Sequence, residues 1–490
     1  MEKVSLAEFQ PLPDGANQYP LEYIEGNAAI KLLEGPEGAR VGVCNPADAS
    51  LLESLRQFHH GQVTFYEIDR SELTGYLGNL LARGGAAAPG TPSSSGEKLA
   101  LDRLANDAPV VNLVNSILSE AIRREASDIH IEAFAERVAV RYRLDGILQT
   151  VSEIDRGRFA AVATRIKIMA NLNIMERRRP QDGRITVHLG DDSVDLRVSV
   201  IPIANGESFV LRVFSRKRAP LTLGQLGMGE GHLAGLVEMA TRPNGLILIN
   251  GPTGSGKTTT LNAVLERIKS DAKKIITIED PIEYLIDGVS QIQTNERIGL
   301  GFDTLLRRVL RQDPNVIMVG EIRDTQTAEL AVRAALTGHL VLSTLHTRDA
   351  VSVITRLKNM EIEPYLIAAV LRGSMAQRLV RRLCPACRRE RAATTAEAAL
   401  LARHDQPPGP VFDAVGCKAC HQTGFRGRLG IFELFTCDGE IEEMIVAGRR
   451  DGDIRRHLAS HGMKPLLADG FAKVLQGVTT LSELERAVAG

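Results

Sequence analysis

An apolar stretch, a glycine-rich turn and a helix-forming stretch follow one another in GLILINGPTGSGKTTTLNAVL, which begins at Gly245. The turn has the spacing G-x-x-x-x-G-K-[ST] between Gly251 and Thr258. A phosphate-binding P-loop needs this motif between a buried strand and the N-terminus of a helix, and the flanking residues supply both. The stretch therefore predicts an α/β fold built around a nucleotide-binding loop. A glycine-rich turn without a ligand is the disfavoured alternative.

The residues of this loop have separate expected roles. Gly254 and Gly256 allow backbone N–H groups to point at phosphate oxygens, and the helix N-terminus adds the positive end of its dipole. Lys257 is expected to reach the β- and γ-phosphates, and the hydroxyl of Thr258 to bind Mg²⁺. We therefore expect ATP and Mg²⁺ at a site formed by Gly251, Pro252, Thr253, Gly254, Ser255, Gly256, Lys257 and Thr258.

Two further predicted strands end in carboxylates. ITIEDPIEY places Glu279 at the end of an apolar run with Glu283 just beyond it, and NVIMVGEIRD places Glu321 similarly. Because strand ends share one edge of a doubly wound sheet, these acids should lie near the P-loop. Gly320 stands where many nucleotide-hydrolysing folds have aspartate. We expect Glu321 to serve Mg²⁺, directly or through water, and Glu279 or Glu283 to polarise the attacking water. Solvated strand-end charges are the alternative.

Two histidines flank the predicted strand in TGHLVLSTLHT, His339 before it and His346 after it. Such positions suit residues that sense the γ-phosphate or relay its loss to a neighbouring domain, and we expect His346 to be the sensor. The alternative for each is a histidine with ordinary packing and hydrogen bonds.

Arginines alternate along predicted strands upstream of the P-loop. Nucleotide hydrolysis is helped by a cation that stabilises the charge developing on the γ-phosphoryl group, and the domain that carries these arginines is the natural donor. Arg197 and Arg212 are the candidate nucleotide-binding residues. Most charge runs are solvated surfaces, and the sequence does not single out one residue.

Four of the six cysteines form two C-x-x-C pairs, Cys384 with Cys387 and Cys417 with Cys420. Four thiolates suit a closed, tetrahedral, structural Zn²⁺ site. The 29 residues between the pairs exceed the common zinc-ribbon spacing, and a short helix over Thr395 to His404 would fill them. Free buried thiols, a redox pair, or His421 as a replacement ligand remain alternatives.

The chain divides into segments of different character. The stretch GGAAAPGTPSSSGEK reads as a flexible linker, because small residues and prolines bury almost nothing. We expect an N-terminal α/β module at 1–83, the linker at 84–98, an α+β domain at 99–225, the P-loop core at 226–383, the tetracysteine subdomain at 384–425 and a helical part at 426–490.

Composition limits the partners. The formal net charge is −1, aromatic residues make up 4% and tryptophan is lacking, whereas single-strand translocases use basic grooves with stacking aromatics. Nucleic acid is therefore not expected as a partner, and a nucleic-acid translocase is the less favoured function for this P-loop protein. The sequence contains no apolar run of 18 residues, so a cytoplasmic protein is expected.

The motifs GPTGSGKT, ITIEDPIEY, LRQDPNVIMVGEIRD and TGHLVLSTLHT occur in the order found in the secretion ATPase superfamily. ASDIHIE, RLDGIL and RIKIMANLNIMERRRPQDGRI also resemble that family's N-terminal half. The resemblance runs from about residue 100 to the end, and it is greatest to the type II secretion ATPases, followed by type IV pilus assembly ATPases. It implies that glycine in place of aspartate at position 320 is usual in this family, whose Walker B segment is atypical.

The resemblance also implies an architecture and partners. We expect a RecA-like ATPase domain preceded by a PAS-like α+β domain, assembled as a homo-hexamer whose ATP sites lie between domains. The expected function is ATP hydrolysis coupled to protein export through a type II secretion system, with pilus assembly as the alternative. We expect the N-terminal module to dock on an inner-membrane protein of the secretion platform, which would hold the cytoplasmic ATPase peripherally at that membrane.

Overall fold

The protein is described by a computed structural model. It covers residues 1–9, 12–13, 18–19, 23–24, 27–35, 38–59, 61–83, 105–189, 192–214 and 221–489. The chain forms two compact units, Met1–Ala100 and Leu101–Gly490. The linker predicted at 84–98 lies outside the described residues.

The N-terminal unit is a small α/β fold around a four-stranded sheet with the order β1-β4-β3-β2. Strand β4 is parallel to β1 and β3, and β2 is antiparallel to β3. The elements are β1 Glu2–Lys3, η1 Leu6–Phe9, β2 Ala29–Gly35, β3 Gly38–Val43, α2 Ala49–Phe58, β4 Val63–Glu67 and α3 Arg70–Arg83. Asp48 caps α2 by accepting a hydrogen bond from the Leu51 N–H. Ile30, Val41 and Leu55 belong to its core.

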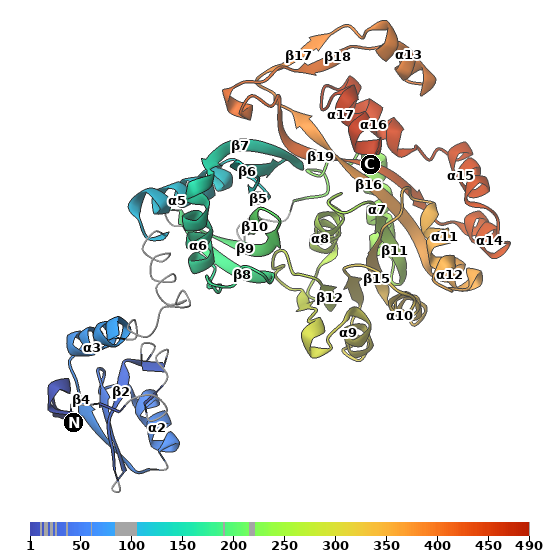
Figure 1. The fold of residues 1–490 in the computed structure, drawn as a ribbon. Helices are drawn as coiled ribbons and strands as arrows, with labels where there is room; N and C mark the ends of the chain where they lie inside the picture. The colour runs from blue at the N-terminus through green and yellow to red at the C-terminus, as the bar shows by residue number, and fades with distance from the viewer. Residues whose placement is uncertain are drawn as a thin grey trace. The chain divides into compact units, whose positions relative to one another are not determined.

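The second unit begins with an antiparallel six-stranded sheet with the order β7-β6-β5-β10-β9-β8 (Figure 1). Its elements are α5 Ala108–Arg123, β5 Asp128–Ala133, β6 Arg137–Leu144, β7 Ile147–Asp155, η3 Arg156–Arg158, α6 Phe159–Met169, β8 Gln181–Leu189, β9 Asp192–Ile203 and β10 Gly206–Phe214. Helix α5 packs Val110, Val114, Ile117, Leu118 and Ala121 into the core of this sheet. Ile122, the neighbour of Ala121, is only half-buried.

A seven-stranded sheet with the order β13-β12-β14-β15-β11-β16-β19 follows. Its neighbouring strands are parallel except for β16 and β19, so the predicted doubly wound, mostly parallel fold is confirmed. The elements up to β16 are α7 Glu230–Thr241, β11 Gly245–Asn250, α8 Lys257–Ile268, β12 Ile275–Glu279, β13 Ser290–Gln293, η4 Glu296–Ile298, α9 Phe302–Val309, β14 Val316–Val319, α10 Thr325–Leu336, β15 Leu340–Leu345, α11 Ser352–Asn359, α12 Pro364–Val370 and β16 Leu371–Leu383.

Strand β11 is apolar along its length because helices cover both faces of the sheet. Leu246 and Leu248 face a core shared with α9, α10 and α12, whereas Ile247 and Ile249 face a core shared with α7 and α8. Every residue of β11 and β15 is buried, as expected for central strands of a parallel sheet. Because both layers hold β11 firmly, the loop that follows Asn250 starts from a fixed point.

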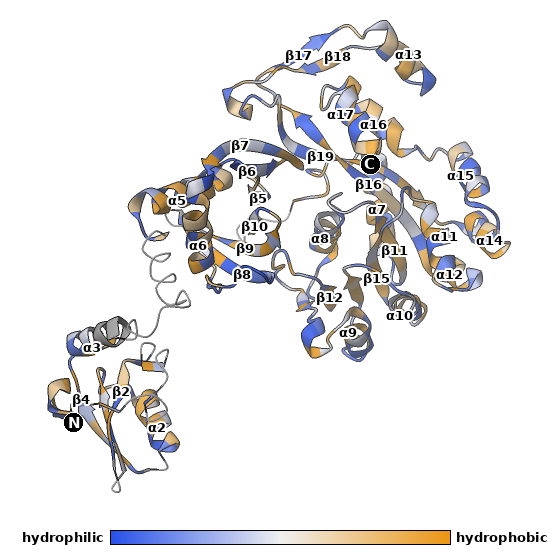
Figure 2. Cartoon of the chain, viewed as in Figure 1, coloured by the Kyte–Doolittle hydropathy of each residue, from blue (hydrophilic) through white to orange (hydrophobic). Residues whose placement is uncertain are grey.

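The C-terminal part adds an edge strand, a two-stranded ribbon and helices. Its elements are β17 Arg388–Arg391, α13 Thr395–Arg403, β18 Val411–Ala414, η5 Lys418–Cys420, β19 Phe425–Thr436, α14 Gly439–Val446, α15 Asp451–Ser460, α16 Leu466–Leu475 and α17 Leu481–Ala489. The helix expected between the cysteine pairs is α13, which opens with a capping box between Thr394 and Glu397. Strand β17 is hydrophilic throughout (Figure 2).

Residues 426–490 were expected to be helical, and the structure corrects this for the first of them. Strand β19 takes up Phe425–Thr436 and pairs antiparallel with β16. Ile431 and Phe432 in its middle are fully buried, because the strand completes the seven-stranded sheet and is covered by α7 and α16. None of the described helices has the length and hydropathy required to cross a bilayer.

Candidate functional site

The P-loop connects β11 to α8 and needs glycine at two positions. Gly254 and Gly256 have φ values of 77° and 87°, in the left-handed region that favours glycine. A Cβ on Gly256 would also lie 2.9 Å from Nε2 of Gln377. That amide donates a hydrogen bond to Ser255 O at 2.9 Å and accepts one from Thr260 Oγ1 at 2.7 Å. Strand β16 therefore holds the loop through one glutamine.

Lys257 points back into its own loop. Its Nζ donates hydrogen bonds to the carbonyl oxygens of Gly251 at 2.8 Å and Pro252 at 3.1 Å. The residue is 9% exposed, and burial lowers the pKa of its ammonium group to about 8, against the opposing charge of Glu321. A phosphate group would give this cation an anionic partner in place of two carbonyls, which suits a phosphate-binding lysine.

A cavity of about 710 Å³ opens beside the P-loop. Its lining combines hydroxyl groups, carboxylates and basic side chains around the N-terminus of α8, a helix end that favours anions. The lining residues are Thr253, Gly254, Ser255, Gly256, Lys257, Thr258, Thr259, Glu279, Asp280, Pro281, Glu283, Phe302, Gly320, Glu321, Arg323, Thr344, His346, Leu379 and Arg428.

Glu279 closes β12 at the wall of this cavity and is only 2% exposed. Its Oε1 accepts hydrogen bonds from Thr277 Oγ1 at 2.6 Å and Gln291 Nε2 at 2.9 Å, whereas Oε2 is buried without a partner. Burial and the charge of Glu279 raise the pKa of the nearby Glu283 carboxyl. A carboxylate that is fixed through one oxygen can use its other oxygen to bind a water molecule or a cation.

Glu321 lies just beyond the end of β14, where it forms an ion pair with Arg323 and lies against His346. The His346 Nε2 atom is 3.5 Å from its Oε2. The preceding residue, Gly320, donates its N–H to Ile278 O at 2.8 Å, and a Cβ there would lie 3.2 Å from the same oxygen. A side chain at position 320 would therefore press on β12. The carboxylate that lines the cavity belongs instead to the next residue, Glu321.

The two histidines around β15 lie at opposite ends of that strand. His346 follows the carboxyl end and lines the cavity with the P-loop. His339 precedes the strand, and its Nδ1 lies 2.9 Å from Ala334 O and 3.1 Å from Thr337 Oγ1. Because the P-loop leaves β11 at its carboxyl end and β15 is parallel to β11, His339 is at the wrong edge of the sheet to contact a γ-phosphate.

The arginines expected at the nucleotide are not among the residues that line the cavity within the described part of the chain. The Arg197 guanidinium lies over the Phe214 ring, 4.7 Å from its centroid. Arg212 Nε donates to Asp128 Oδ1 at 2.9 Å; burial alone would raise the Asp128 pKa, but the bonds from Arg212 and Ser127 lower it. Both arginines come from exposed positions of paired strands, where each has a local partner.

Two other arginines, Arg323 and Arg428, line the cavity instead. Arg323 lies two residues after Glu321, so its position beside the strand end was available from the sequence. Arg428 comes from β19, whose strand character was not recognised, and it reaches the cavity only because β19 pairs with β16.

The residues present fit ATP with Mg²⁺. The P-loop offers backbone N–H groups and a lysine to phosphate oxygens, as anion binding at a helix N-terminus requires. Mg²⁺ takes oxygen ligands, and Thr258 and Glu321 supply a hydroxyl and a carboxylate in the same cavity. The unpartnered Oε2 of Glu279 is a further acceptor at its wall.

The four cysteine Sγ atoms gather between β16, η5 and the start of β19, all within 4.8 Å of one another. Three of the separations are 3.9 Å for Cys384 and Cys417, 3.8 Å for Cys387 and Cys420, and 3.7 Å for Cys417 and Cys420. Zn–S bonds of about 2.3 Å in a tetrahedron place sulfur atoms roughly 3.8 Å apart. The distances exclude a disulfide and fit Zn²⁺.

Backbone groups support this cluster. The N–H groups of Cys417 and Gly424 donate to Cys420 Sγ at 3.1 and 3.2 Å, as expected around a metal-bound thiolate. His421, considered as a replacement ligand, is not part of the group of four. It lines a separate cavity.

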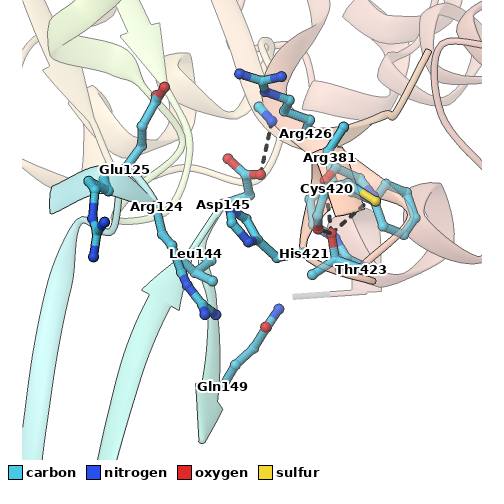
Figure 3. A pocket seen from close by; sticks show the side chains of 14 residues that line it. Arg124, Glu125, Leu144, Asp145, Gln149, Arg381, Cys420, His421, Thr423 and Arg426 are labelled. Atoms are coloured by element: carbon cyan, nitrogen blue, oxygen red, sulfur yellow. Dashed lines mark hydrogen bonds between the residues drawn. The ribbon is translucent and has the colours of Figure 1, made fainter. Parts of the chain in front are cut away.

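That second cavity, of about 270 Å³, lies between the antiparallel domain and the tetracysteine cluster (Figure 3). Arg124, Asp145 and Gln149 line it from one side, and Cys420 and Arg426 from the other. Asp145 Oδ2 accepts a hydrogen bond from the Gly427 N–H at 2.9 Å. This hydrogen bond therefore joins the antiparallel domain to strand β19, one residue before Arg428.

Comparisons with known proteins find a matching family and similar sequences. Residues 103–486 match the family described as type II/IV secretion system protein. The chain is 43% identical over 480 residues to the type II secretion system protein HxcR of Pseudomonas aeruginosa, covering 95% of this chain and 98% of that one. It is 49% identical over 381 residues to the type II secretion system protein E of the same species, covering 78% and 76%.

Two further similarities are to motor proteins of pili. The chain is 37% identical over 498 residues to the type IV pilus assembly ATPase PilB of Myxococcus xanthus, covering 98% of this chain and 88% of that one. Its fold is similar to the crystal structure of the pilus retraction motor PilT with bound ADP, with a TM-score of 0.53 and 26% identity over 76% of this chain and 94% of that one.

Proposed function

The chain belongs to the type II/IV secretion system protein family, and on that premise we propose that it hydrolyses ATP to drive protein export through a type II secretion system. The resemblance to secretion ATPases found in the motifs is confirmed by this membership. The observation that carries the proposal is the common cavity of the P-loop, Glu279 and Glu321. This combination joins phosphate binding to two differently held carboxylates.

The proposed chemistry follows from how each side chain is held. Lys257 exchanges its two carbonyl partners for phosphate oxygens and stabilises their charge. Mg²⁺, when bound, neutralises charge on the β- and γ-phosphates, and Thr258 with Glu321 would hold it. Glu279 uses its free Oε2 to orient and polarise the attacking water, because Thr277 and Gln291 already fix its other oxygen. His346 lies against Glu321 and is the candidate γ-phosphate sensor.

Two arginines of the cavity add positive charge to this site. Arg323 holds Glu321, and Arg428 enters from β19 as a partner for phosphate charge. Arg197 and Arg212 remain proposed contributors across an assembled ring, where a neighbouring chain would supply the nucleotide. The assembly we propose is a homo-hexamer.

The N-terminal unit is the proposed docking module for an inner-membrane protein of the secretion platform, which would place this ATPase on the cytoplasmic side of that membrane. Support comes from its separate compact fold. Within the described residues, the groups of metal-ligating side chains all belong to the second unit. Deletion of residues 1–83 should preserve ATP binding and move the protein out of the membrane fraction in cells with the complete system.

Pilus assembly is the second candidate, favoured by the match that spans 98% of this chain to a pilus assembly ATPase. The experiment that tests the proposal is ATP turnover by the purified protein, followed by complementation of strains that lack either motor. Export restored without pili supports the proposal, and pili restored without export overturns it in favour of the second candidate.

The matched variants for both assays are Lys257→Ala and Lys269→Ala, two lysines at opposite ends of α8. Lys257→Ala should lose ATP turnover and complementation, whereas Lys269→Ala should retain them. Normal turnover by Lys257→Ala would remove the P-loop from the mechanism.

A further inference from the structure

A second group of metal-ligating side chains lies C-terminal to the cysteines, and we propose that it binds a divalent transition-metal ion of the Zn²⁺ class. The group consists of Glu440, His457 and His461, whose ligand atoms lie within 4.8 Å of one another. It shares no residue with the nucleotide cavity or with the tetracysteine cluster.

Two helices present these ligands. Glu440 lies in the first turn of α14, His457 in the last turn of α15, and His461 is the residue that ends α15. Residues four apart on a helix lie on the same face, one turn above the other, so both imidazoles approach from one side. Helix α14 is anchored by Ile441 and Ile445, and α15 by Ile454 and Leu458, in the core beneath the seven-stranded sheet.

The hydrogen bond of His461 fixes which nitrogen can bind a metal. Its Nδ1 lies 2.9 Å from the carbonyl oxygen of His457. Because a carbonyl only accepts, Nδ1 must carry the proton of this bond, which leaves Nε2 as the nitrogen with a free lone pair. Metal-binding histidines usually donate their second N–H to a carbonyl or carboxylate in this way.

The other two ligands already lie at a coordination distance from each other. His457 Nε2 is 3.5 Å from Glu440 Oε2, and ligand atoms about 2.1 Å from a tetrahedral ion are roughly 3.4 Å apart. The ring centroids of His457 and His461 are 4.3 Å apart. The Glu440 side chain is 72% exposed, so its carboxylate has room to turn toward an ion held by the two imidazoles.

The ligand set determines the class of ion. Imidazole nitrogens favour Zn²⁺, Ni²⁺ or Cu²⁺, whereas Mg²⁺ and Ca²⁺ prefer oxygen ligands. Three protein ligands leave at least one coordination position to solvent, unlike the closed tetracysteine site. The ion would tie the start of α14 to the end of α15.

The test is a zinc titration of the full-length protein by calorimetry, together with metal analysis after removal of loosely bound ions. Wild-type protein should bind one ion more than the His457→Ala/His461→Ala double variant, which keeps its cysteine site. The matched control is His188→Ala, an exposed histidine of β8 that belongs to neither group. Cobalt(II) adds a second readout, because the cysteine site gives sulfur-to-metal charge-transfer absorption and the proposed site does not.

Glu440→Gln separates loss of metal binding from loss of the fold, since an exposed carboxylate can be changed without disturbing the core. This variant should bind the second ion at least about 10-fold more weakly, the smallest loss expected even for residues outside the first coordination shell. Equal zinc stoichiometry and affinity in wild type and all three variants would mean an adventitious ion only and would overturn the proposal. So would a wild-type protein that binds zinc only at the cysteines.

Discussion

Asp145 accepts a hydrogen bond from the backbone N–H of Gly427, with Oδ2 and N 2.9 Å apart (Figure 3). Asp145 lies in the turn between β6 and β7, and Gly427 directly precedes Arg428, which lines the nucleotide cavity. The bond therefore links the antiparallel domain to the strand that carries a cation into the ATP site.

Loss of the Asp145 carboxylate should lower the turnover number for ATP while changing KM little. Asp145→Gly is the variant to use, because φ at this residue is 48° and glycine adopts that conformation without strain. A single hydrogen bond contributes about 1 kcal/mol, so the expected effect is about 3-fold to 10-fold in steady-state kinetics. Asp145→Asn, which keeps an acceptor oxygen and also tolerates positive φ, should restore turnover.

Equal turnover in Asp145→Gly, Asp145→Asn and wild type would show that this contact does not position Arg428. A fall in both variants would point instead to the carboxylate charge, since only asparagine keeps the hydrogen bond.

The affinity for ATP should decrease at alkaline pH because of Lys257. Burial lowers the pKa of this lysine to about 8, and phosphate favours its charged form. Below that pKa the free protein already carries the charge, so binding needs no proton. Above it, binding must take up one proton, and the dissociation constant should rise up to about tenfold per pH unit. The measurement is equilibrium ATP binding between pH 7 and 9.5.

Lys257→Arg is the control for this pH dependence. Arginine keeps its charge over the whole range, so the variant should bind ATP with a weaker but nearly constant affinity. The same alkaline loss in Lys257→Arg would assign the effect to another group.

Those parts of the site that depend on neighbouring residues of the chain could be predicted from the sequence. The spacing from Gly251 to Thr258 predicts the P-loop, and the apolar runs before Glu279 and Glu321 place both acids at the strand ends that border the cavity. The position of His339 away from the P-loop edge could also have been predicted, because a parallel strand has a direction and His339 precedes it. Only residues after a strand can join the P-loop edge of the sheet.

Contacts between distant segments could not be predicted in this way. Asp145 and Gly427 are 282 residues apart, and no periodicity relates them. Arg428 reaches the cavity through the pairing of β19 with β16, a contact that depends on the complete sheet. The partners of Arg197 and Arg212 are likewise set by strand register, which a single sequence leaves open.

Replacing one zinc ligand should destabilise the C-terminal ribbon without unfolding the seven-stranded sheet. Cys417→Ser removes one of four thiolates whose spacing fits tetrahedral Zn²⁺. Structural zinc contributes folding free energy directly, so β17, β18 and α13 should become susceptible to proteolysis. Metal analysis should show loss of one zinc ion per chain, with ATP binding retained.

Cys44→Ser is the control, since this half-buried cysteine lies in the N-terminal unit outside the cluster. Wild-type protein that contains no stoichiometric metal when purified without chelator would contradict the zinc assignment.

The two carboxylates of the ATP site should respond differently to removal of their charge. Glu279→Gln keeps an oxygen for Thr277 but loses the negative charge of the unpartnered Oε2, so it should bind ATP and hydrolyse it at least about 10²-fold more slowly at any Mg²⁺ concentration. Glu321→Gln should also slow hydrolysis by about 10²-fold, but part of its activity should return at high Mg²⁺, because its expected role is to hold that ion.

The measurement is steady-state ATP turnover over a range of Mg²⁺ concentrations, with binding of a fluorescent ATP analogue as a check on the fold. Glu329→Gln, an exposed glutamate on α10, should behave like the wild type in both assays. If excess Mg²⁺ restores Glu279→Gln and not Glu321→Gln, the two roles are exchanged. If Glu279→Gln hydrolyses ATP normally, the water must be polarised by another group, and Glu283 is next because burial and Glu279 raise the pKa of its carboxyl at the same wall of the cavity.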